Sequence, residues 1–102
     1  MKEEITPGKI NCNQKSIVMN YNNAILIDVR STIEYNEEHL DGAINIPYDS
    51  ILDDIKVIDN VSFDSPIIVY CKSGTRSAKA ASSLKTAGYN KVYDLGAMSS
   101  CK

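Results

Sequence analysis

The chain has 102 residues, which is enough for one hydrophobic core but not for two, so we expect a single domain over residues 1–102. Hydrophobic residues make up 43% and charged residues 24%, a balance typical of a folded globular protein rather than a disordered one. The net charge is −2 and the chain has no basic run, which excludes a protein that binds along a nucleic-acid backbone.

The first predicted elements lie in the N-terminal third. Ile10 falls in a short alternation of apolar and polar residues that predicts a brief strand, and residues 14–20 contain enough helix formers for a short helix. Residues 24–29 (AILIDV) form a continuous and largely branched apolar run, which predicts a strand buried on both faces. Such a strand belongs in a parallel sheet that helices cover on both sides.

The next segment carries helix and turn signals. Ser31 and Glu34 have the S-x-x-E spacing in which a hydroxyl and a carboxylate cap the first turn of a helix, which should run to about His39. Residues 43–46 then predict a brief strand that a proline ends. Residues 48–58 carry apolar side chains at helix-like spacings and predict a further helical or irregular segment.

The C-terminal third contains the second strong strand. Residues 67–70 (IIVY) form an apolar run that ends directly at Cys71. Residues 77–87 place alanine and leucine on one face and lysine and serine on the other, which predicts a helix, and Gly88 fits the position just after its end. Residues 91–95 predict a last short strand. Strands that alternate with helices indicate an α/β fold with a mostly parallel sheet.

The three cysteines, Cys12, Cys71 and Cys101, are an odd number spread along the chain, without CxxC pairs or partner histidines. This pattern argues against a disulfide scaffold and against a structural zinc site, so we expect no metal. The N-terminus has no apolar core of signal-peptide length, and no stretch approaches the ~20 apolar residues that span a bilayer. We therefore expect no export, no membrane contact, a cytoplasmic location and a reactive thiol among the three.

Cys71 is the strongest candidate for that thiol. It stands at the carboxyl end of a buried strand, ahead of a tight loop and a helix, where α/β sheets place their ligand sites. The small residues 73–75 let backbone N–H groups turn inward, and the helix directs the positive end of its dipole at the same place. Lys72 and Arg76 add two positive charges, which should lower the thiol pKa and attract a small anion. The alternative is that Cys71 is only a small buried hydrophobic residue at a strand end.

The sequence also resembles a known family. The segments that carry the resemblance follow the family's order over about residues 22–97. They are LIDVR (26–30), EY (34–35), His39 with GAINIP (42–47), IVYC (68–71) continuing through Ser77, and AGY (87–89). Together these motifs are similar to those of a single-domain rhodanese, a sulfurtransferase that carries sulfur on a cysteine.

The resemblance implies a three-layer sandwich with a central, mainly parallel sheet of about five strands and helices on both faces. Cys71 would accept a sulfane sulfur from thiosulfate, a polysulfide or a persulfide and pass it to cyanide or a thiol. No metal or organic cofactor is implied. The expected partners are a small anionic sulfur donor and, as a further option, a protein thiol or persulfide, and the protein is expected to be a monomer. The expected substrate cradle consists of Lys72, Ser73, Gly74, Thr75, Arg76 and Ser77.

Three places depart from the family pattern. Glu38 stands where a glycine is usual, Gly96 and Ala97 replace a pair of glycines, and Cys101 lies where many members have a tryptophan. The first two are expected to adjust the backbone or the charge near the site. Cys101 could be a resolving thiol that attacks a Cys71 persulfide, releasing sulfide and forming a disulfide, or it could be only a tail residue.

Three further residues have a structural and a functional interpretation. Asp28 and Arg30 end the first strong strand and should face the same crevice as Cys71, where they could support the loop. A structural ion pair, for instance between Arg30 and Glu34, is favoured over direct chemistry for both. His39, the only histidine, is expected to lie in a structural turn, because no carboxylate at suitable spacing marks a catalytic pair.

Two other functions stay open. A cysteine phosphatase or an arsenate reductase also uses a loop between a cysteine and an arginine, but that loop is longer. Here four residues separate Cys71 from Arg76, so the cradle should be too small for a tetrahedral oxyanion. The second alternative is a rhodanese-like module that keeps the fold and serves in binding or sulfur sensing, with little turnover.

Overall fold

The centre of the molecule is a five-stranded sheet in which every pair of neighbouring strands is parallel. The computed structural model describes residues 4–102. The sheet order is β1-β5-β4-β2-β3, which confirms the predicted α/β class. The strands are β1 (Gly8–Lys9), β2 (Ile25–Asp28), β3 (Ile44–Asn45), β4 (Ile67–Cys71) and β5 (Val92–Ala97).

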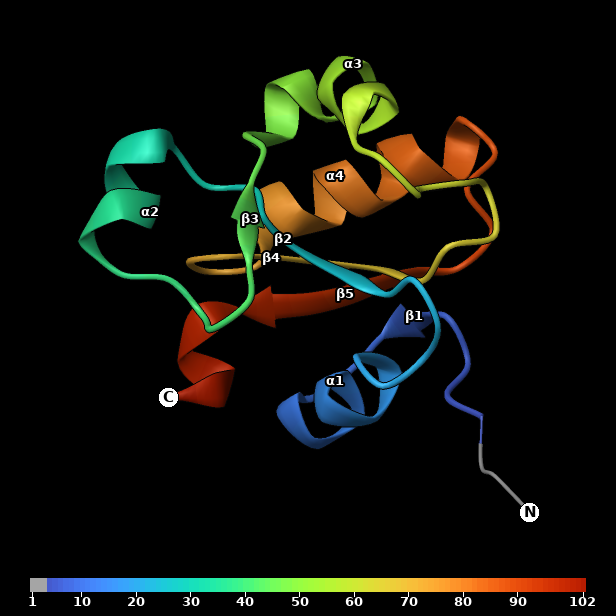
Figure 1. Ribbon diagram of the computed structural model, residues 1–102. Coiled ribbons are helices and arrows are strands. Elements are labelled where there is room, and N and C mark those ends of the chain that lie inside the picture. The colour runs from blue at the N-terminus through green and yellow to red at the C-terminus, as the bar shows by residue number, and fades with distance from the viewer. Residues whose placement is uncertain (1–3) are drawn as a thin grey trace.

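Helices cover both faces of this sheet. Figure 1 shows α3 and α4 on one side, α1 and the C-terminal turn on the other, and α2 beyond the carboxyl end of β2. The α-helices are α1 (Cys12–Val18), α2 (Thr32–Glu37), α3 (Ile51–Asp54) and α4 (Thr75–Thr86). Three short 3₁₀ turns are η1 (Tyr48–Ser50), η2 (Ile55–Val57) and η3 (Met98–Cys101).

The central strand β4 divides the core into two halves. Val69 and Cys71 pack in the cluster under α4, whereas Ile68 and Tyr70 pack in the cluster on the face that carries α1. This alternation follows from the two-residue repeat of a strand, and all four side chains are fully buried. The side chain of Cys71 therefore belongs to the α4 face of the sheet.

Capping residues explain where the two N-terminal helices begin and end. Asn11 and Gln14 form a reciprocal capping box with both N–H···O distances at 2.9 Å, so α1 starts at Cys12, ahead of the predicted residue 14. Ser31 and Glu34 form the predicted capping box of α2. That helix stops at Glu37, short of the predicted end, because the next residue is extended.

A bulge shapes the end of the sheet nearest to the candidate site. Val69 is paired with Asp94, but Tyr70 is paired with Gly96, which leaves Leu95 as the extra residue in β5. The Asp94 carboxylate accepts a hydrogen bond from the Gly96 N–H at 2.9 Å and fixes the bulge. Strand β5 thereby extends beyond the predicted residue 95 and runs alongside the end of β4.

The odd cysteine count argued against a disulfide scaffold, but the structure contains a disulfide that this pattern did not predict. Cys12 and Cys101 form a disulfide with a Cα–Cα distance of 5.3 Å. The two residues are 89 positions apart, so only the tertiary structure brings them together and their spacing carries no signal. Within residues 4–102, none of the helices has the length and apolar character needed to cross a bilayer.

Candidate active site

Backbone N–H groups of the following loop and helix donate hydrogen bonds to the sulfur of Cys71. The N–H of Gly74 donates to Sγ at 3.0 Å and the N–H of Ser77 donates at 3.3 Å. Both donors belong to the loop and first turn of α4, which begins at Thr75, two residues earlier than predicted. The positive end of the α4 dipole therefore points at the sulfur, as expected from the sequence.

These contacts change the acidity of the thiol. Burial raises the pKa of Cys71, but hydrogen bonds from the Ser77 side chain and backbone outweigh it, with help from the Gly74 and Ser73 N–H groups. The net result is a pKa below the ordinary value for cysteine. Because the thiolate is the reactive form of cysteine, these hydrogen bonds favour the form of Cys71 that can act as a nucleophile.

Ser77 and Gly74 hold the turn in shape. The Ser77 hydroxyl lies 3.1 Å from the Gly74 carbonyl, and its single proton can serve either that carbonyl or the sulfur. Gly74 has a φ of 105°, a left-handed conformation that strongly favours glycine. The Cys71 side chain has no exposed surface, so a reagent reaches Sγ only when the loop moves.

Arg76 is engaged by a residue that the sequence analysis treated only as a helix cap. Its guanidinium forms a two-point ion pair with Glu34, with Nη1–Oε1 at 2.7 Å and Nη2–Oε2 at 3.0 Å. The guanidinium holds the pKa of Glu34 down to about 2. The charge of Arg76 is therefore largely neutralised, and its side chain ties α4 to α2 rather than standing free as an anion ligand.

Asp28 and Arg30 form a second ion pair on the opposite face of the sheet. Arg30 Nη2 lies 2.7 Å from Asp28 Oδ2 and donates to the carbonyl of Glu38 at 2.6 Å. The guanidinium also lies over the ring of Tyr70, 5.9 Å from its centroid. The sequence analysis favoured a structural ion pair for these residues, and the suggested partner of Arg30 was Glu34. That pairing is wrong, because Arg30 pairs with Asp28 and Glu34 pairs with Arg76.

Lys72 is the loop cation that forms no ion pair within residues 4–102. It is exposed and lines a hollow of about 360 Å³ beside the loop. The remaining lining comes from α2 with the residues around it and from the C-terminal turn: Arg30, Glu34, Glu37, Glu38, Met98, Ser99 and Lys102. No sequence pattern indicated that η3 lines this hollow, because only the fold brings η3 close to the loop.

The two remaining candidates lie away from the sulfur's surroundings. His39 stacks on Tyr35, with ring centroids 3.8 Å apart, and its Nδ1 lies 2.9 Å from the Tyr35 carbonyl, which is a structural turn contact. Cys101 packs with the core on the α1 face, whereas Cys71 packs under α4. Because Cys101 is also bonded to Cys12, this form of the protein has no free thiol there to resolve a Cys71 persulfide.

Comparison with known proteins places this geometry in context. A protein-family model described as Rhodanese-like domain matches residues 13–99. A structure titled as rhodanese with anions from E. coli superposes with a TM-score of 0.71 at 32% identity and covers 76% of this chain and 89% of that one. Reduced CoADR-RHD of Bacillus anthracis gives a TM-score of 0.75 at 28% identity, covering 93% of this chain and 16% of that one.

Relatives in sequence include proteins of several descriptions. YqhL of Bacillus subtilis is 38% identical over 76 residues, which is 74% of this chain and 57% of YqhL. The probable adenylyltransferase/sulfurtransferase MoeZ of Mycobacterium tuberculosis is 37% identical over 70 residues, 69% of this chain and 18% of MoeZ. A tRNA uridine(34) hydroxylase of Enterobacter sp. is 35% identical over 75 residues, 71% of this chain and 22% of that protein. The chain thus spans less than two thirds of the length of each of these relatives, from 18% of MoeZ to 57% of YqhL.

Proposed function

We propose that this chain, which belongs to the rhodanese-like domain family, is a sulfurtransferase that moves a sulfane sulfur through a persulfide on Cys71. The observation that carries the proposal is the pair of backbone N–H groups that donate to Sγ, Gly74 at 3.0 Å and Ser77 at 3.3 Å. Donors fixed at the start of a helix stabilise a thiolate before sulfur arrives and stabilise the anionic persulfide afterwards. The relatives that are named as sulfurtransferases support the same class of reaction.

The proposed reaction has two steps. In the first, the Cys71 thiolate attacks the outer sulfur of thiosulfate, the S–S bond of the donor breaks, and sulfite leaves with the bonding electrons. In the second, cyanide or a thiolate attacks the terminal sulfur of the persulfide, and Cys71 leaves as a thiolate. No general base is needed, because the lowered pKa of Cys71 already favours the nucleophile.

A polysulfide or a persulfide can replace thiosulfate as the donor in the same two steps. Lys72 is the charged residue best placed to attract an anionic donor, since Arg76 and Arg30 are each neutralised by a carboxylate. The thiol of a partner protein is a further acceptor of the sulfur, and the hollow next to Lys72 leaves room for it.

The placement of Arg76 favours sulfur transfer over phosphate ester or arsenate chemistry. A phosphatase-type loop needs its arginine to grip the oxyanion above the cysteine, but here Glu34 holds the guanidinium at 2.7 and 3.0 Å. The four residues between Cys71 and Arg76 also make a short loop. A single sulfur atom is the cargo that suits this cradle best.

The experiment that tests the proposal is intact-protein mass spectrometry after brief incubation with thiosulfate or tetrasulfide, followed by cyanide. Wild-type protein should gain the mass of sulfur and lose it to cyanide with release of thiocyanate. The Cys71→Ser variant should do neither. Sulfur loading that survives this substitution, or a free Cys71 thiol that no donor loads, would refute the proposed persulfide.

A further inference from the structure

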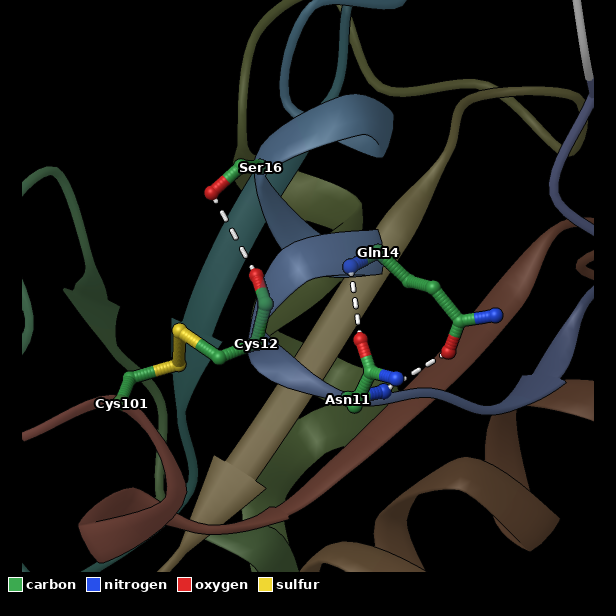
Figure 2. The surroundings of a disulfide bond; sticks show 5 residues. All are labelled: Asn11, Cys12, Gln14, Ser16 and Cys101. Atoms are coloured by element: carbon green, nitrogen blue, oxygen red, sulfur yellow. Dashed lines mark hydrogen bonds between the residues drawn. A yellow bond between two sulfur atoms is a disulfide. The ribbon is translucent and has the colours of Figure 1, made fainter.

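The Cys12–Cys101 disulfide joins two segments from opposite ends of the chain. Figure 2 shows Cys12 in the first turn of α1, beside the Asn11–Gln14 capping box, and Cys101 on the C-terminal turn. The capping box fixes the backbone at Cys12, and the Ser16 hydroxyl donates to the Cys12 carbonyl at 3.3 Å. Both cysteines are partly exposed, so the pair is accessible to small reagents without unfolding of the core.

The disulfide is the covalent bond that ties the turn η3 to α1. Met98 at the start of η3 is buried, but Ser99 and Lys102 are exposed. Lys102 also forms an ion pair with Glu38, the residue that follows α2, but both side chains are about half exposed, and exposed pairs of this kind contribute little to stability. Breaking the disulfide therefore leaves the end of η3 weakly held.

The same turn forms one wall of the hollow beside the active-site loop. Met98, Ser99 and Lys102 line that hollow together with Lys72, the residue after the reactive cysteine. A change in the position of η3 would therefore change the surroundings of Lys72, the residue next to Cys71. The disulfide and the active site are thus connected through a single short segment.

A second hollow, of about 280 Å³, lies directly against Cys101. Its rim includes two lysines, Lys15 and Lys102, and two carboxylates, Glu38 and Asp41. The charges balance, so the hollow admits a small reagent without selecting strongly for either sign.

We propose that Cys12 and Cys101 form a second sulfur-reactive site. The proposal rests on the partly exposed disulfide between them and on the turn η3, which carries Cys101 and lines the hollow beside Lys72. Sulfane sulfur oxidises this dithiol to the disulfide, and the state of the pair sets how freely reagents reach Cys71. The proposal deepens the proposed function, on which it rests for the class of donor, but it requires no chemistry at Cys71.

The reaction balances with a polysulfide as the oxidant. One thiolate attacks a sulfane sulfur, the S–S bond of the polysulfide breaks, and a shortened polysulfide leaves, which gives a cysteine persulfide. The second thiol loses its proton and attacks the carbon-bound sulfur of that persulfide, so that the Cys12–Cys101 bond forms and hydrosulfide leaves. In sum, two thiols lose two electrons and two protons, and one sulfane sulfur atom is reduced to sulfide. A dithiol reductant reverses the change.

The first test uses the Cys71→Ser variant, so that only the dithiol can react. The protein is reduced, desalted without oxygen and treated with tetrasulfide. Mass spectrometry without reductant should show loss of two hydrogens and a Cys12–Cys101 peptide pair, with one equivalent of sulfide released by the resolution step. The matched control, Cys71→Ser with Cys101→Ser, should gain sulfur without losing two hydrogens.

Two outcomes would overturn this part of the proposal. The dithiol could stay reduced over a period in which tetrasulfide fully loads Cys71 in wild-type protein, or the control could lose two hydrogens as well. A wild-type protein whose Cys71 never loads would instead refute the sulfurtransferase proposal and leave the dithiol result standing. The two failures are therefore distinguishable.

The second test measures the coupling to the active site. The rate of alkylation of Cys71 by iodoacetamide is followed on its own peptide in oxidised wild type and in the Cys12→Ser/Cys101→Ser variant. We expect alkylation in the variant to be faster by about threefold or more, because the end of η3 opens locally. Circular dichroism checks that both proteins are folded. Equal rates in two folded proteins would refute the coupling.

Discussion

Glu34 and Arg76 lie 42 residues apart and form a two-point ion pair that fastens α2 to the first turn of α4. Glu34 also accepts hydrogen bonds from the backbone and hydroxyl of Ser31, so one carboxylate caps a helix and holds the active-site arginine. The loop that carries the donors to Cys71 is thus braced from outside. In the proposed site, Arg76 therefore braces the loop and does not stand free as a cation.

Replacing the carboxylate should loosen this brace. We expect Glu34→Gln to lower the free energy of unfolding by about 1 kcal/mol, since the pair is partly exposed, and to slow sulfur loading of Cys71. Asp54→Asn, an exposed carboxylate on α3 outside any ion pair in residues 4–102, is the control. Urea unfolding and loading kinetics measure both effects. Identical loading rates in the two variants would show that the pair has no role in the site.

The same pair predicts an acid dependence. Arg76 lowers the pKa of Glu34 from 4.5 to about 2, so the carboxylate is more acidic in the folded than in the unfolded protein. Its contribution to stability is complete above about pH 4.5 and is lost as the pH falls through about 2. The stability difference between wild type and Glu34→Gln should therefore be constant at neutral pH and shrink in that acid range. A difference that disappears already near pH 6 would contradict the assignment.

The thiol pKa gives a third prediction. Ser77→Ala removes a hydroxyl within reach of Sγ and should raise the pKa of Cys71 towards the ordinary value of ~8.5. The pH dependence of iodoacetamide alkylation reports this pKa, and the wild-type inflection should lie at lower pH than the inflection of the variant. Ser82→Ala, an exposed position on the same helix, should leave the inflection unchanged. A wild-type inflection above that of Ser77→Ala would contradict the proposed activation.

Much of the fold could be predicted because its signals are local. The apolar runs that become β2 and β4, the Ser31–Glu34 capping box and the position of Cys71 at a strand end all depend on neighbours in sequence. The arrangement of N–H donors around the sulfur could be predicted for the same reason, since these donors lie within six residues of Cys71. Where a feature is encoded in a short segment, the sequence pattern is sufficient.

Features that depend on residues far apart in the sequence could not be predicted. Arg30 was expected to meet Glu34 four residues on, but Asp28 lies closer at the same strand end and Glu34 is held by Arg76. The bond between Cys12 and the C-terminal turn spans 89 positions, and an odd number of cysteines concealed it. In each case, tertiary packing selects one partner among several that are chemically suitable.

Gly74 allows the cost of a strained backbone to be separated from the chemistry of the site. Gly74→Ala places a side chain at a φ of 105° but meets nothing closer than the Gly96 Cα at 4.0 Å, so the cost of about 1 kcal/mol is conformational. Gly42→Ala, with a φ of 82° and open space around it, should cost a similar amount of stability. Only the Gly74 variant should slow sulfur loading. Equal loading by both variants would show that the left-handed conformation at Gly74 is not needed for sulfur loading.

The disulfide should contribute measurably to stability because it closes most of the chain into a loop. With 89 positions between Cys12 and Cys101, reduction should lower the free energy of unfolding by about 2–4 kcal/mol. For a domain of this size, each kcal/mol corresponds to a shift of roughly 4–8 °C in Tm. The Cys12→Ser/Cys101→Ser variant should unfold at the temperature of reduced wild type and be insensitive to reductant, which thermal melts with and without a phosphine will measure. If reductant lowers the Tm of that variant as well, the effect does not come from this bond.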